Sequence, residues 1–399
     1  MTPLQGRNIV LGVTGSIAAY KAADLTSKLV QAGAVVDVIL TPSAREFVTP
    51  FTFRSLTGRP VYTDMFKPAT DEREEHVGLA RRADAVLIAP ATATTIARLA
   101  HGLADELVSL TVLATTAPVV VAPAMDAQMW EAAATQANVA TLREQGVTFV
   151  GPEEGRLASG HAGLGRLAET EAILGAVKMV LGRGGDLAGR RIVVSAGGTR
   201  EAIDPVRYIG NRSSGKQGFA LAEAARDRGA RVTLVAAPTA LAAPYGVELV
   251  QVESVAAMRD AVLSACAGAG ALLMAAAVSD FRPAAAGEQK IKKGEAGLLL
   301  ELAQTDDILS EVPDTLVKVG FAAETEDLLA NAAKKLAAKR LDLICANDVS
   351  AADAGFGADT NRVTILDRAG GRQELPLLSK YEVAQRVLDR VAALLSQRR

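Results

Sequence analysis

The sequence predicts an α/β protein with two doubly wound domains, each built on a mainly parallel sheet. Short apolar segments typical of buried strands alternate along the whole chain with amphipathic segments typical of helices. The order strand, helix, strand also appears twice, at 8–42 and at 191–239, and each copy reaches a proline after its second strand. With 399 residues, of which 49% are hydrophobic and 22% charged, the chain is long enough for two cores.

The first strand–helix–strand unit predicts a ligand site at its carboxyl edge. Residues 8–13 and 35–40 form apolar strands, and Ser16 is the expected N-cap of a helix that ends at Gly33. Ligands of such units bind beyond the carboxyl ends of the strands. The turn departs from the Gly-x-Gly-x-x-Gly pattern of dinucleotide sites, and hydroxyl groups suit a single phosphate better than a pyrophosphate. The hydroxylated residues at these two strand ends are Thr14, Ser16, Thr41 and Ser43.

Further elements complete the first domain and suggest where it ends. Buried strands are predicted at 85–89 and 118–122, with a helix between them that begins near Thr95. Residues 151–168 have no periodicity and many glycines, which is typical of a mobile loop or lid. A short helix over 169–181 leads into a glycine-rich stretch. We therefore expect domains at 1–182 and 191–399, joined by a linker at 183–190.

The second domain is organised around a long loop, residues 195–219, between a strand at 191–194 and a helix at 219–228. A strand-to-helix turn in such units ordinarily has only a few residues. Its glycines allow backbone N–H groups to approach an anion, and a helix start favours negative charge. The loop therefore predicts a site for phosphate and carboxylate, with a solvated surface loop as the alternative. Its basic residues are Arg200, Arg207, Arg212 and Lys216.

Two basic stretches elsewhere in the second domain are candidates for contact with a triphosphate. One is Lys290-Ile-Lys-Lys, and the other is a helix on which Lys335 and Lys339 share a face. A solvated surface is the alternative for both, and it is favoured for Lys334. The remaining elements expected in this domain are strands at 232–237, 248–252, 271–277, 317–321, 342–346 and 363–366, and a C-terminal helix at 380–395.

Composition excludes several classes of partner. The net charge is −2 and no long basic run occurs, which argues against nucleic-acid binding. The only two cysteines, Cys266 and Cys345, lie far apart in apolar surroundings, which offers no disulfide framework or zinc site and fits a reducing cytoplasm. No segment has the length and apolarity of a signal peptide or a membrane span. We expect a cytoplasmic protein without a membrane partner.

Long motifs in both halves resemble one enzyme family. The first half contains Gly12-Val-Thr-Gly-Ser-Ile and Pro123-Ala-Met-Asp-Ala-Gln-Met-Trp. The second contains Asp204-Pro-Val-Arg-Tyr-Ile-Gly-Asn-Arg-Ser-Ser-Gly-Lys and Leu343-Ile-Cys-Ala-Asn-Asp. In this order they resemble the bifunctional bacterial enzyme of coenzyme A synthesis, phosphopantothenoylcysteine decarboxylase fused to phosphopantothenate–cysteine ligase. The resemblance implies two Rossmann-like domains, a flavodoxin-like flavoprotein domain followed by a nucleotide-binding ligase domain.

For the second half, the resemblance implies CTP-dependent ligation. CTP activates the carboxylate of 4′-phosphopantothenate as an acyl-cytidylate, and the amine of L-cysteine then displaces CMP. By resemblance Asn211 holds the acyl-cytidylate with Arg207 nearby, and Mg²⁺ accompanies the triphosphate. The residues implied around CTP are Ala276, Asp280, Lys290, Asp306, Ile308, Phe321, Lys335 and Lys339.

For the first half, the resemblance implies FMN-dependent decarboxylation of phosphopantothenoylcysteine to 4′-phosphopantetheine. His76 matches the active-site histidine of the family, whereas a lone histidine in a polar segment would otherwise be read as exposed surface. The FMN contacts are implied at Gly15, Ser16, Thr41, Ser43, Pro90, Ala91 and Thr92.

Two positions depart from the family pattern. Asp126 stands where the family has Asn, and Ser159 stands where the lid carries the Cys that donates a proton. An ionised Asp cannot donate a hydrogen bond to the substrate carboxylate, and a hydroxyl is a far weaker acid than a thiol. One hypothesis is a protonated Asp126, with His161 or a water held by Ser159 giving the proton. The other is a first half that turns over slowly or stalls at the enethiol.

Other function classes stay open at this stage. The first domain could be impaired or serve as a flavin-binding regulatory module beside an active ligase. A nicotinamide dehydrogenase is the other rival, although neither half opens a helix with Gly-x-Gly-x-x-Gly after a strand. The resemblance also implies a homo-oligomer, with a trimer-based first domain, a dimeric second domain and a possible dodecamer.

Overall fold

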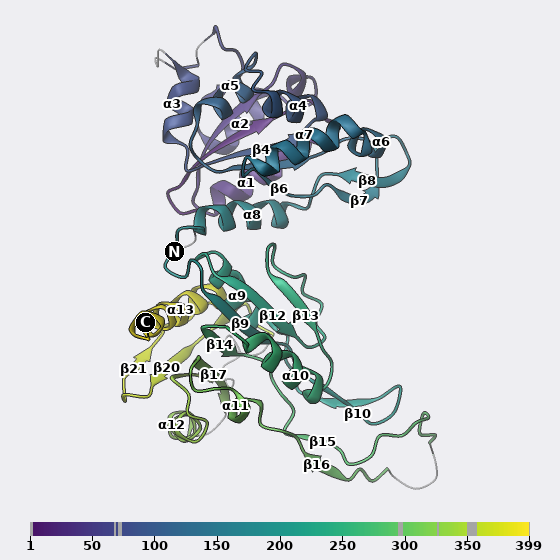
Figure 1. The fold of residues 1–399 in the computed structure, drawn as a ribbon, viewed down its shortest axis with the longest axis vertical. Helices are drawn as coiled ribbons and strands as arrows, with labels where there is room; N and C mark the ends of the chain where they lie inside the picture. Colours follow the sequence, from purple (N-terminus) through teal and green to yellow (C-terminus); the bar gives the residue numbers. More distant parts are fainter. Residues whose placement is uncertain are drawn as a thin grey trace. The chain divides into compact units, whose positions relative to one another are not determined.

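The computed structural model divides the chain into two compact units, Met1–Gly182 and Arg183–Arg399. It describes residues 3–67, 69–70, 74–293, 298–324, 327–348 and 357–398. Each unit has its own mainly parallel sheet with helices on both faces, so the predicted fold class is confirmed (Figure 1). In the described part of the chain, no helix is long and apolar enough to cross a membrane.

The first unit is built on a six-stranded parallel sheet of order β3-β2-β1-β4-β5-β6. Its central strands are almost continuously buried because helices cover both faces. The strands are β1 (Asn8–Val13), β2 (Val35–Leu40), β3 (Val61–Tyr62), β4 (Ala85–Ala91), β5 (Val119–Pro123) and β6 (Thr148–Phe149).

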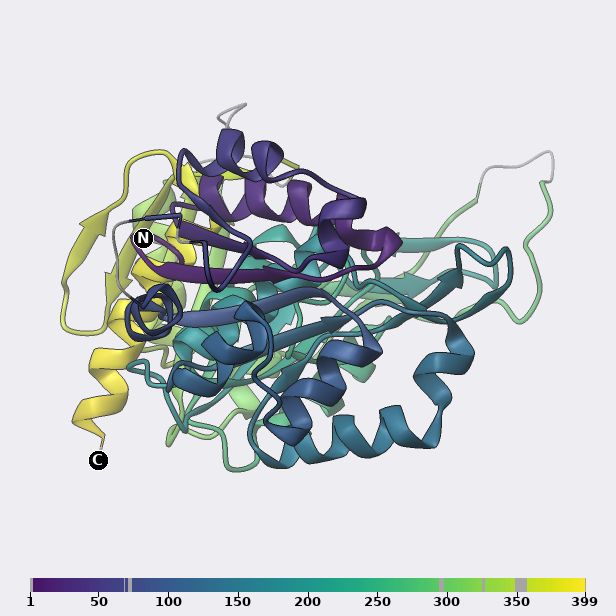
Figure 2. The same ribbon diagram turned by 90° about the horizontal axis from the view of Figure 1, so that it is seen from above.

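Two layers of helices enclose this sheet. Seen from above, α1 and α2 lie on one side of the sheet and α7 lies on the other (Figure 2). Ser16 caps a short 3₁₀ helix that leads into α1, whereas the N-cap of α1 itself is Tyr20, so Ser16 is an N-cap but not of the predicted helix. The helices are η1 (Ile17–Tyr20), α1 (Lys21–Gln31), η2 (Ser43–Glu46), α2 (Pro50–Thr57), α3 (Glu75–Arg82), α4 (Ala93–His101), α5 (Leu107–Ala114), α6 (Ala127–Glu131), α7 (Ala133–Glu144) and α8 (Thr170–Gly182).

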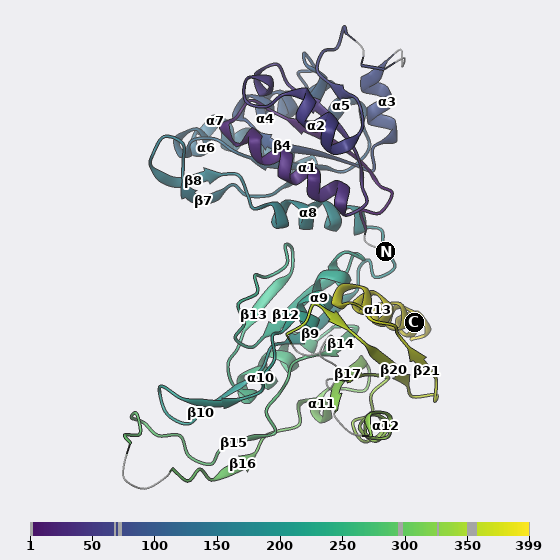
Figure 3. The same ribbon diagram turned by 180° about the vertical axis from the view of Figure 1, so that it is seen from behind.

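The stretch 151–168 was expected to be a mobile loop or lid, and it has more regular structure than a loop. It forms an antiparallel hairpin of β7 (Glu153–Arg156) and β8 (Ala162–Arg166), which lies beside α6 (Figures 1 and 3). Its glycines serve close packing as well as turning: a Cβ atom at Gly163 would lie 2.8 Å from the Cβ of Ala127. Composition alone does not separate these two uses of glycine.

The second unit is built on an eight-stranded sheet of order β13-β12-β9-β14-β17-β18-β20-β21. The sheet is parallel from β13 to β18, and β20 and β21 join it antiparallel. The strands are β9 (Arg191–Ala196), β12 (Arg231–Ala236), β13 (Glu248–Gln251), β14 (Ala271–Met274), β17 (Val317–Glu324), β18 (Leu343–Asp348), β20 (Val363–Asp367) and β21 (Arg372–Glu374).

Helices cover both faces of this second sheet. One core packs α9 and α13 against the sheet, and the other packs α10, α11 and α12 against it. A capping box fixes the start of α13, because the side chains of Ser379 and Glu382 each accept a backbone N–H of the other. The helices are α9 (Lys216–Arg226), α10 (Val255–Cys266), α11 (Ile308–Glu311), α12 (Leu328–Ala338) and α13 (Lys380–Gln397).

The long loop after β9 has more regular structure than predicted. A small hairpin of β10 (Arg200–Ala202) and β11 (Tyr208–Gly210) lies within it, and α9 begins at Lys216 instead of 219. The strand expected at 271–277 also ends early, at Met274. The remaining short pairs are β15 (Phe281–Pro283) with β16 (Leu302–Gln304), and β19 (Thr360–Asn361) with β22 (Leu378–Ser379).

Candidate functional site

A cavity of about 660 Å³ lies at the carboxyl edge of the second sheet, beyond β14, β17 and β18. This is the edge at which doubly wound sheets bind ligands. Side chains from the loop after β9, from α11 and α12, and from the start of α13 reach the same cavity. The chain thus brings together residues that are up to about 170 positions apart, from Asn211 to Lys380.

One end of the cavity pairs lysines with carboxylates. Lys335 of α12 and Lys339, which follows that helix, line it together with Asp306 and Asp307. The Nζ of Lys339 donates to Asp307 Oδ1 at 3.1 Å. This end therefore offers hydrogen-bond donors and acceptors side by side. The apolar side chain of Ile308 lies next to them.

The other end of the cavity is the N-terminus of α9. Gly215 has a φ of 76°, a left-handed conformation that suits glycine, and it turns the chain into the helix. Ser213 and Ser214 precede it and line the cavity. Lys216 follows, and its Nζ donates to Asp359 Oδ1 at 2.7 Å. Backbone N–H groups, hydroxyls and the helix dipole make this end suitable for phosphate.

Basic and amide side chains enclose this end of the cavity, which is suited to phosphate. Lys380, at the start of α13, is buried and lines the cavity. Burial lowers the pKa of its ammonium group, and the charge of Lys216 lowers it further, whereas Asp359 raises it. The Nε2 of Gln217 donates to the backbone oxygen of Lys380 at 3.1 Å, and Asn361 Nδ2 donates to Gln217 Oε1 at 3.3 Å. These contacts connect α9 to α13.

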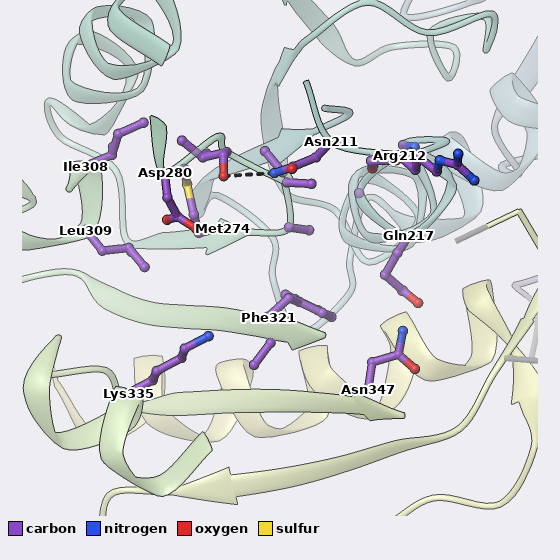
Figure 4. A pocket seen from close by; sticks show the side chains of 18 of the residues that line it. Asn211, Arg212, Gln217, Met274, Asp280, Ile308, Leu309, Phe321, Lys335 and Asn347 are labelled. Carbon is purple, nitrogen blue, oxygen red and sulfur yellow. Dashed lines mark hydrogen bonds between the residues drawn. The ribbon is translucent and has the colours of Figure 1, made fainter. Parts of the chain in front are cut away.

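Asn211 lies between the two ends and lines the cavity together with Asp280 (Figure 4). Its Nδ2 donates to the backbone oxygen of Val278 at 3.1 Å, which leaves its second N–H for a ligand. Glycine allows this placement, because a Cβ atom at Gly198 would lie 2.6 Å from the backbone oxygen of Asn211. In Figure 4 the side chain of Asn347 points from β18 toward Gln217 of α9.

The structure brings together most, but not all, of the residues predicted for the second domain. Arg207 and Lys290 do not line the cavity. The predicted residues that do line it are Asn211, Ala276, Asp280, Asp306, Ile308, Phe321, Lys335 and Lys339. Arg212 and Lys216, two basic residues of the loop predicted to bind phosphate, also line it, and cavity residues that no prediction named include Ser213, Ser214, Gln217, Asn347, Asn361 and Lys380. The Ser-Ser-Gly-Lys run before a helix was the signal for Ser213 and Ser214.

Arg207 instead holds the β10–β11 turn to the segment that carries Lys290. Its Nε and a terminal nitrogen donate to Asp204 Oδ2 at 3.0 and 2.6 Å, and that nitrogen also donates to the backbone oxygen of Ile291 at 2.8 Å. These hydrogen bonds from Arg207, helped by backbone N–H groups, hold the pKa of the buried Asp204 well below its usual range. Lys290 itself is exposed.

In the first unit, hydroxyl groups organise the carboxyl edge of the sheet. Thr14 Oγ1 donates to the backbone oxygen of Pro90 at 2.7 Å and accepts the N–H of Thr92 at 3.1 Å, which ties β1 to β4. Thr92 also caps α4. A Cβ atom at Gly15 would lie 2.9 Å from Ser43 Oγ, so glycine allows these two loops to meet.

The seven residues implied for FMN therefore divide into two groups. Gly15, Ser16 and Thr92 are half-buried, and Ser43 is exposed at the same edge. The other three, Thr41, Pro90 and Ala91, are buried and contribute to the framework of the loops. Thr41, for example, uses its Oγ1 to accept the N–H of Ala44 at 3.2 Å.

His76 is half-buried in the first turn of α3. The preceding residue, Glu75, fixes this turn because its Oε1 accepts the backbone N–H groups of Ala69 and Thr70 at 2.6 and 2.7 Å. Part of the polar segment predicted ahead of His76, residues 71–73, lies outside the described residues.

Asp126 and Ser159, the two departures from the family pattern, contact each other. Ser159 Oγ donates to Asp126 Oδ2 at 2.8 Å, and Asp126 Oδ1 accepts the N–H of Gln128 at 3.1 Å. The hydroxyl, then this N–H and the charge of His161, lower the pKa of Asp126 below its ordinary value. These contacts favour the carboxylate, contrary to the protonated Asp126 considered from the sequence.

Within the described residues, no group of three or more His, Cys, Asp or Glu side chains is arranged to hold a metal ion. Both cysteines are buried and form no disulfide.

Two family models together match almost the whole chain. The Flavoprotein model matches residues 1–182, and the model of the DNA/pantothenate metabolism flavoprotein C-terminal domain matches residues 187–395. The coenzyme A biosynthesis bifunctional protein CoaBC of Bacillus subtilis (strain 168) is 48% identical over 400 residues, which cover 99% of this chain and 98% of that protein. The protein of the same name from Mycobacterium tuberculosis (strain CDC 1551 / Oshkosh) is 45% identical over 98% of this chain and 97% of its own length. Among solved structures, the C-terminal domain of a coenzyme A biosynthesis bifunctional protein CoaBC is 40% identical to the part of this chain that it matches. The match covers 53% of this chain and 98% of the solved domain, with a TM-score of 0.46.

Proposed function

The chain belongs to the family of coenzyme A biosynthesis bifunctional proteins, and on that premise we propose which residues carry each of its two reactions. It is a bifunctional enzyme of coenzyme A biosynthesis, with decarboxylase and ligase activities. The Met1–Gly182 unit carries the decarboxylase, and the Arg183–Arg399 unit carries the ligase. Family membership does not favour a purely regulatory role for the first unit.

The observation that supports the ligase site is a cavity with paired lysines and carboxylates at one end, a helix N-terminus at the other and Asn211 between them. We assign the phosphates of CTP to the α9 end, where Ser213, Ser214 and Lys216 surround a helix N-terminus. Bound Mg²⁺ would supply positive charge that offsets the charge of the triphosphate. The base is placed at the opposite end, because cytosine has both hydrogen-bond acceptors and an amino donor that match the Lys339–Asp307 pair.

Both ligation steps then occur beside Asn211. One carboxylate oxygen of 4′-phosphopantothenate bonds to the α-phosphorus of CTP, and pyrophosphate leaves. The nitrogen of L-cysteine next bonds to the acyl carbon, loses a proton, and CMP leaves. The second N–H of Asn211 donates to the acyl oxygen, on which negative charge develops during this attack.

The carboxyl edge of the first sheet fits FMN. The chemistry of its donor set suits a monophosphate, because Ser16, Ser43 and Thr92 meet there around a glycine that allows close approach of the backbone. Bound FMN would supply a two-electron oxidation of the substrate thiol and the later return of those electrons. His76, held in the first turn of α3, serves as the acid–base group toward the substrate.

The full-length enzyme tests these assignments when it is supplied with 4′-phosphopantothenate, L-cysteine and CTP. We expect pyrophosphate, CMP, CO2 and 4′-phosphopantetheine. His76→Asn should stop CO2 release while pyrophosphate release continues. Asn211→Ala should stop pyrophosphate release, but it should still release CO2 when phosphopantothenoylcysteine is supplied directly. Accumulation of phosphopantothenoylcysteine by the unmodified enzyme would instead favour an impaired first unit.

We also propose a cytoplasmic homo-oligomer. Two buried, unpaired cysteines fit a reducing compartment. Large apolar side chains are exposed near the FMN edge of the first unit, including Ile17 (58%), Tyr20 (61%) and Phe51 (76%), which is typical of a surface that binds a second copy. Native mass spectrometry of the full chain tests this, and a monomer at micromolar concentration would contradict it.

A further inference from the structure

In the β7–β8 hairpin, the strand β8 is fastened to the start of α6 at Gly163 and Gly165. The backbone N–H of Met125 donates to the oxygen of Gly165 at 3.0 Å. A Cβ atom at Gly165 would overlap the backbone oxygen of Met125, so this approach requires glycine. These contacts lie on β8, which leaves the turn at 157–161 beyond the anchored part of the hairpin.

The turn has its own internal hydrogen bonds. The N–H of Leu157 donates to the oxygen of His161 at 2.8 Å, and the N–H of Gly160 donates to the oxygen of Leu157 at 3.0 Å. These bonds shape the turn, but they do not attach it to the rest of the unit. Ser159 is exposed, so burial of this side chain does not attach the turn either.

The hydrogen bond from Ser159 Oγ to Asp126 Oδ2, 2.8 Å long, does connect the turn to the sheet. Asp126 follows β5, at the carboxyl edge where the substrate site is proposed, and its Oδ1 caps α6 through the N–H of Gln128. The carboxylate therefore has one oxygen committed to the helix and the other to the hairpin. A carboxylate only accepts hydrogen bonds, so it needs a donor such as the serine hydroxyl.

We propose that Asp126 and Ser159 act as one unit, a latch that holds the turn of the β7–β8 hairpin closed beside the decarboxylase site. The latch positions His161, which lies two residues beyond Ser159 on the same turn. The closed position of the turn is inferred from the hydrogen bond between Ser159 and Asp126, whereas the role of the latch in turnover rests on the proposed decarboxylase function. Asp126 and Ser159 are positioning residues here, and the two changes from the family pattern form a matched pair.

Cleavage by trypsin after Arg156 reports opening of the turn, because Arg156 is exposed and directly precedes it. Ser159→Ala in the full-length protein should raise this cleavage rate about fivefold, the size expected for the typical net contribution of one hydrogen bond. In the Asp126→Ala background, Ser159→Ala should add nothing further, since its acceptor is already absent. Ser159→Thr keeps a hydroxyl donor and should restore protection, and Ser55→Ala, an exposed serine on α2, is the matched control.

The pH dependence identifies which group holds the turn. The pKa of Asp126 is below its ordinary value, so the carboxylate persists above that ordinary value and protection should be constant between pH 5 and 8. His161 is the charged group that acts on Asp126. A change in protection within this pH range would show that a group other than the Asp126 carboxylate holds the turn, and this would overturn the proposal.

Activity measurements test the latch separately from the decarboxylase function, on which the role of the latch in turnover rests. Release of CO2 and formation of 4′-phosphopantetheine should fall in Ser159→Ala and recover in Ser159→Thr, in parallel with protection. Unchanged cleavage in Ser159→Ala, or additive effects of the two substitutions, would refute the latch. Absence of CO2 from the unmodified enzyme would refute the decarboxylase function instead, and the protection measurements would still decide the latch.

Discussion

The close approach of α9 to β9 allows a sharp test of how the ligase cavity is built. Gly218 lies in the first turn of α9, where an added Cβ atom would lie 2.5 Å from the Cβ of Ala196 and 2.7 Å from the backbone oxygen of Ser195. Neither neighbour can rotate away, because one is a backbone atom and the other is fixed to the backbone. Gly218→Ala therefore forces α9 away from the sheet by about 1 Å, to reach ordinary contact distances.

The substitution has opposing effects on stability. Alanine favours the helix over glycine by about 1 kcal/mol, whereas overpacking of this kind costs about 1–3 kcal/mol. The overlap with backbone places the cost in the upper part of that range, which leaves a net loss of about 1–2 kcal/mol. For a unit of this size, the loss corresponds to a fall in Tm of about 2–8 °C.

The functional loss should be larger than the stability loss. A shift of α9 moves Ser214, Gly215 and Lys216, which line the proposed phosphate end of the cavity. A misplacement of about 1 Å can reduce turnover about 100-fold, so CTP-dependent pyrophosphate release should fall about 10- to 100-fold. Release of CO2 from supplied phosphopantothenoylcysteine should not change, because that reaction is assigned to the other unit.

Gly184→Ala is the matched control, because Gly184 lies in the same unit and no atom lies within 4 Å of its added Cβ. Thermal unfolding and the two activity assays on both variants complete the test. If Gly218→Ala matched Gly184→Ala in Tm and in pyrophosphate release, the packing argument and the assignment of phosphate to the α9 end would both be refuted.

Three further predictions concern charge and burial. Lys339→Ala should raise the KM for CTP about tenfold in steady-state assays, since a charge-assisted contact is lost, whereas Lys334→Ala, exposed and outside the cavity lining, should leave it unchanged. Burial raises the pKa of the Cys266 thiol to about 11 and raises that of the Cys345 thiol further. A thiol reagent at pH 8 should therefore label neither cysteine in the folded protein and both cysteines in denaturant. Labelling of the folded protein would contradict the burial of the two thiols. The pKa of Asp204 lies well below the ordinary value of a carboxyl group, so the stabilising contacts of this carboxylate persist above the ordinary value and are lost only as the pH falls below it. Hydrogen exchange in the β10–β11 hairpin, corrected for intrinsic rates, should therefore be equal at pH 5 and pH 8. In Asp204→Asn the exchange should be faster at both pH values.

Much of the fold followed from local patterns. The strands at 8–13 and 35–40 have the predicted bounds, because short apolar runs between turn residues specify buried parallel strands directly. The predicted helix at 380–395 differs only at its end, since Ser379 and Glu382 form a cap that fixes its start. The hairpin at 153–166 was missed because its strands are rich in glycine and only partly buried, and they show no alternation of apolar and polar residues.

The sequence by itself determined the two α/β domains and the family, because strand, helix and motif signals are local in the chain. Only the tertiary structure decided which side chains meet. Arg207 lies inside a predicted motif, yet it binds Asp204 instead of lining the cavity, whereas Lys380 completes the cavity from a helix more than 160 residues beyond that motif. Asp126 and Ser159 looked like two separate departures from the family pattern, and they prove to share one hydrogen bond across 33 residues. Spacing in the chain carries no information about such contacts, because packing of the sheets and their helices sets them.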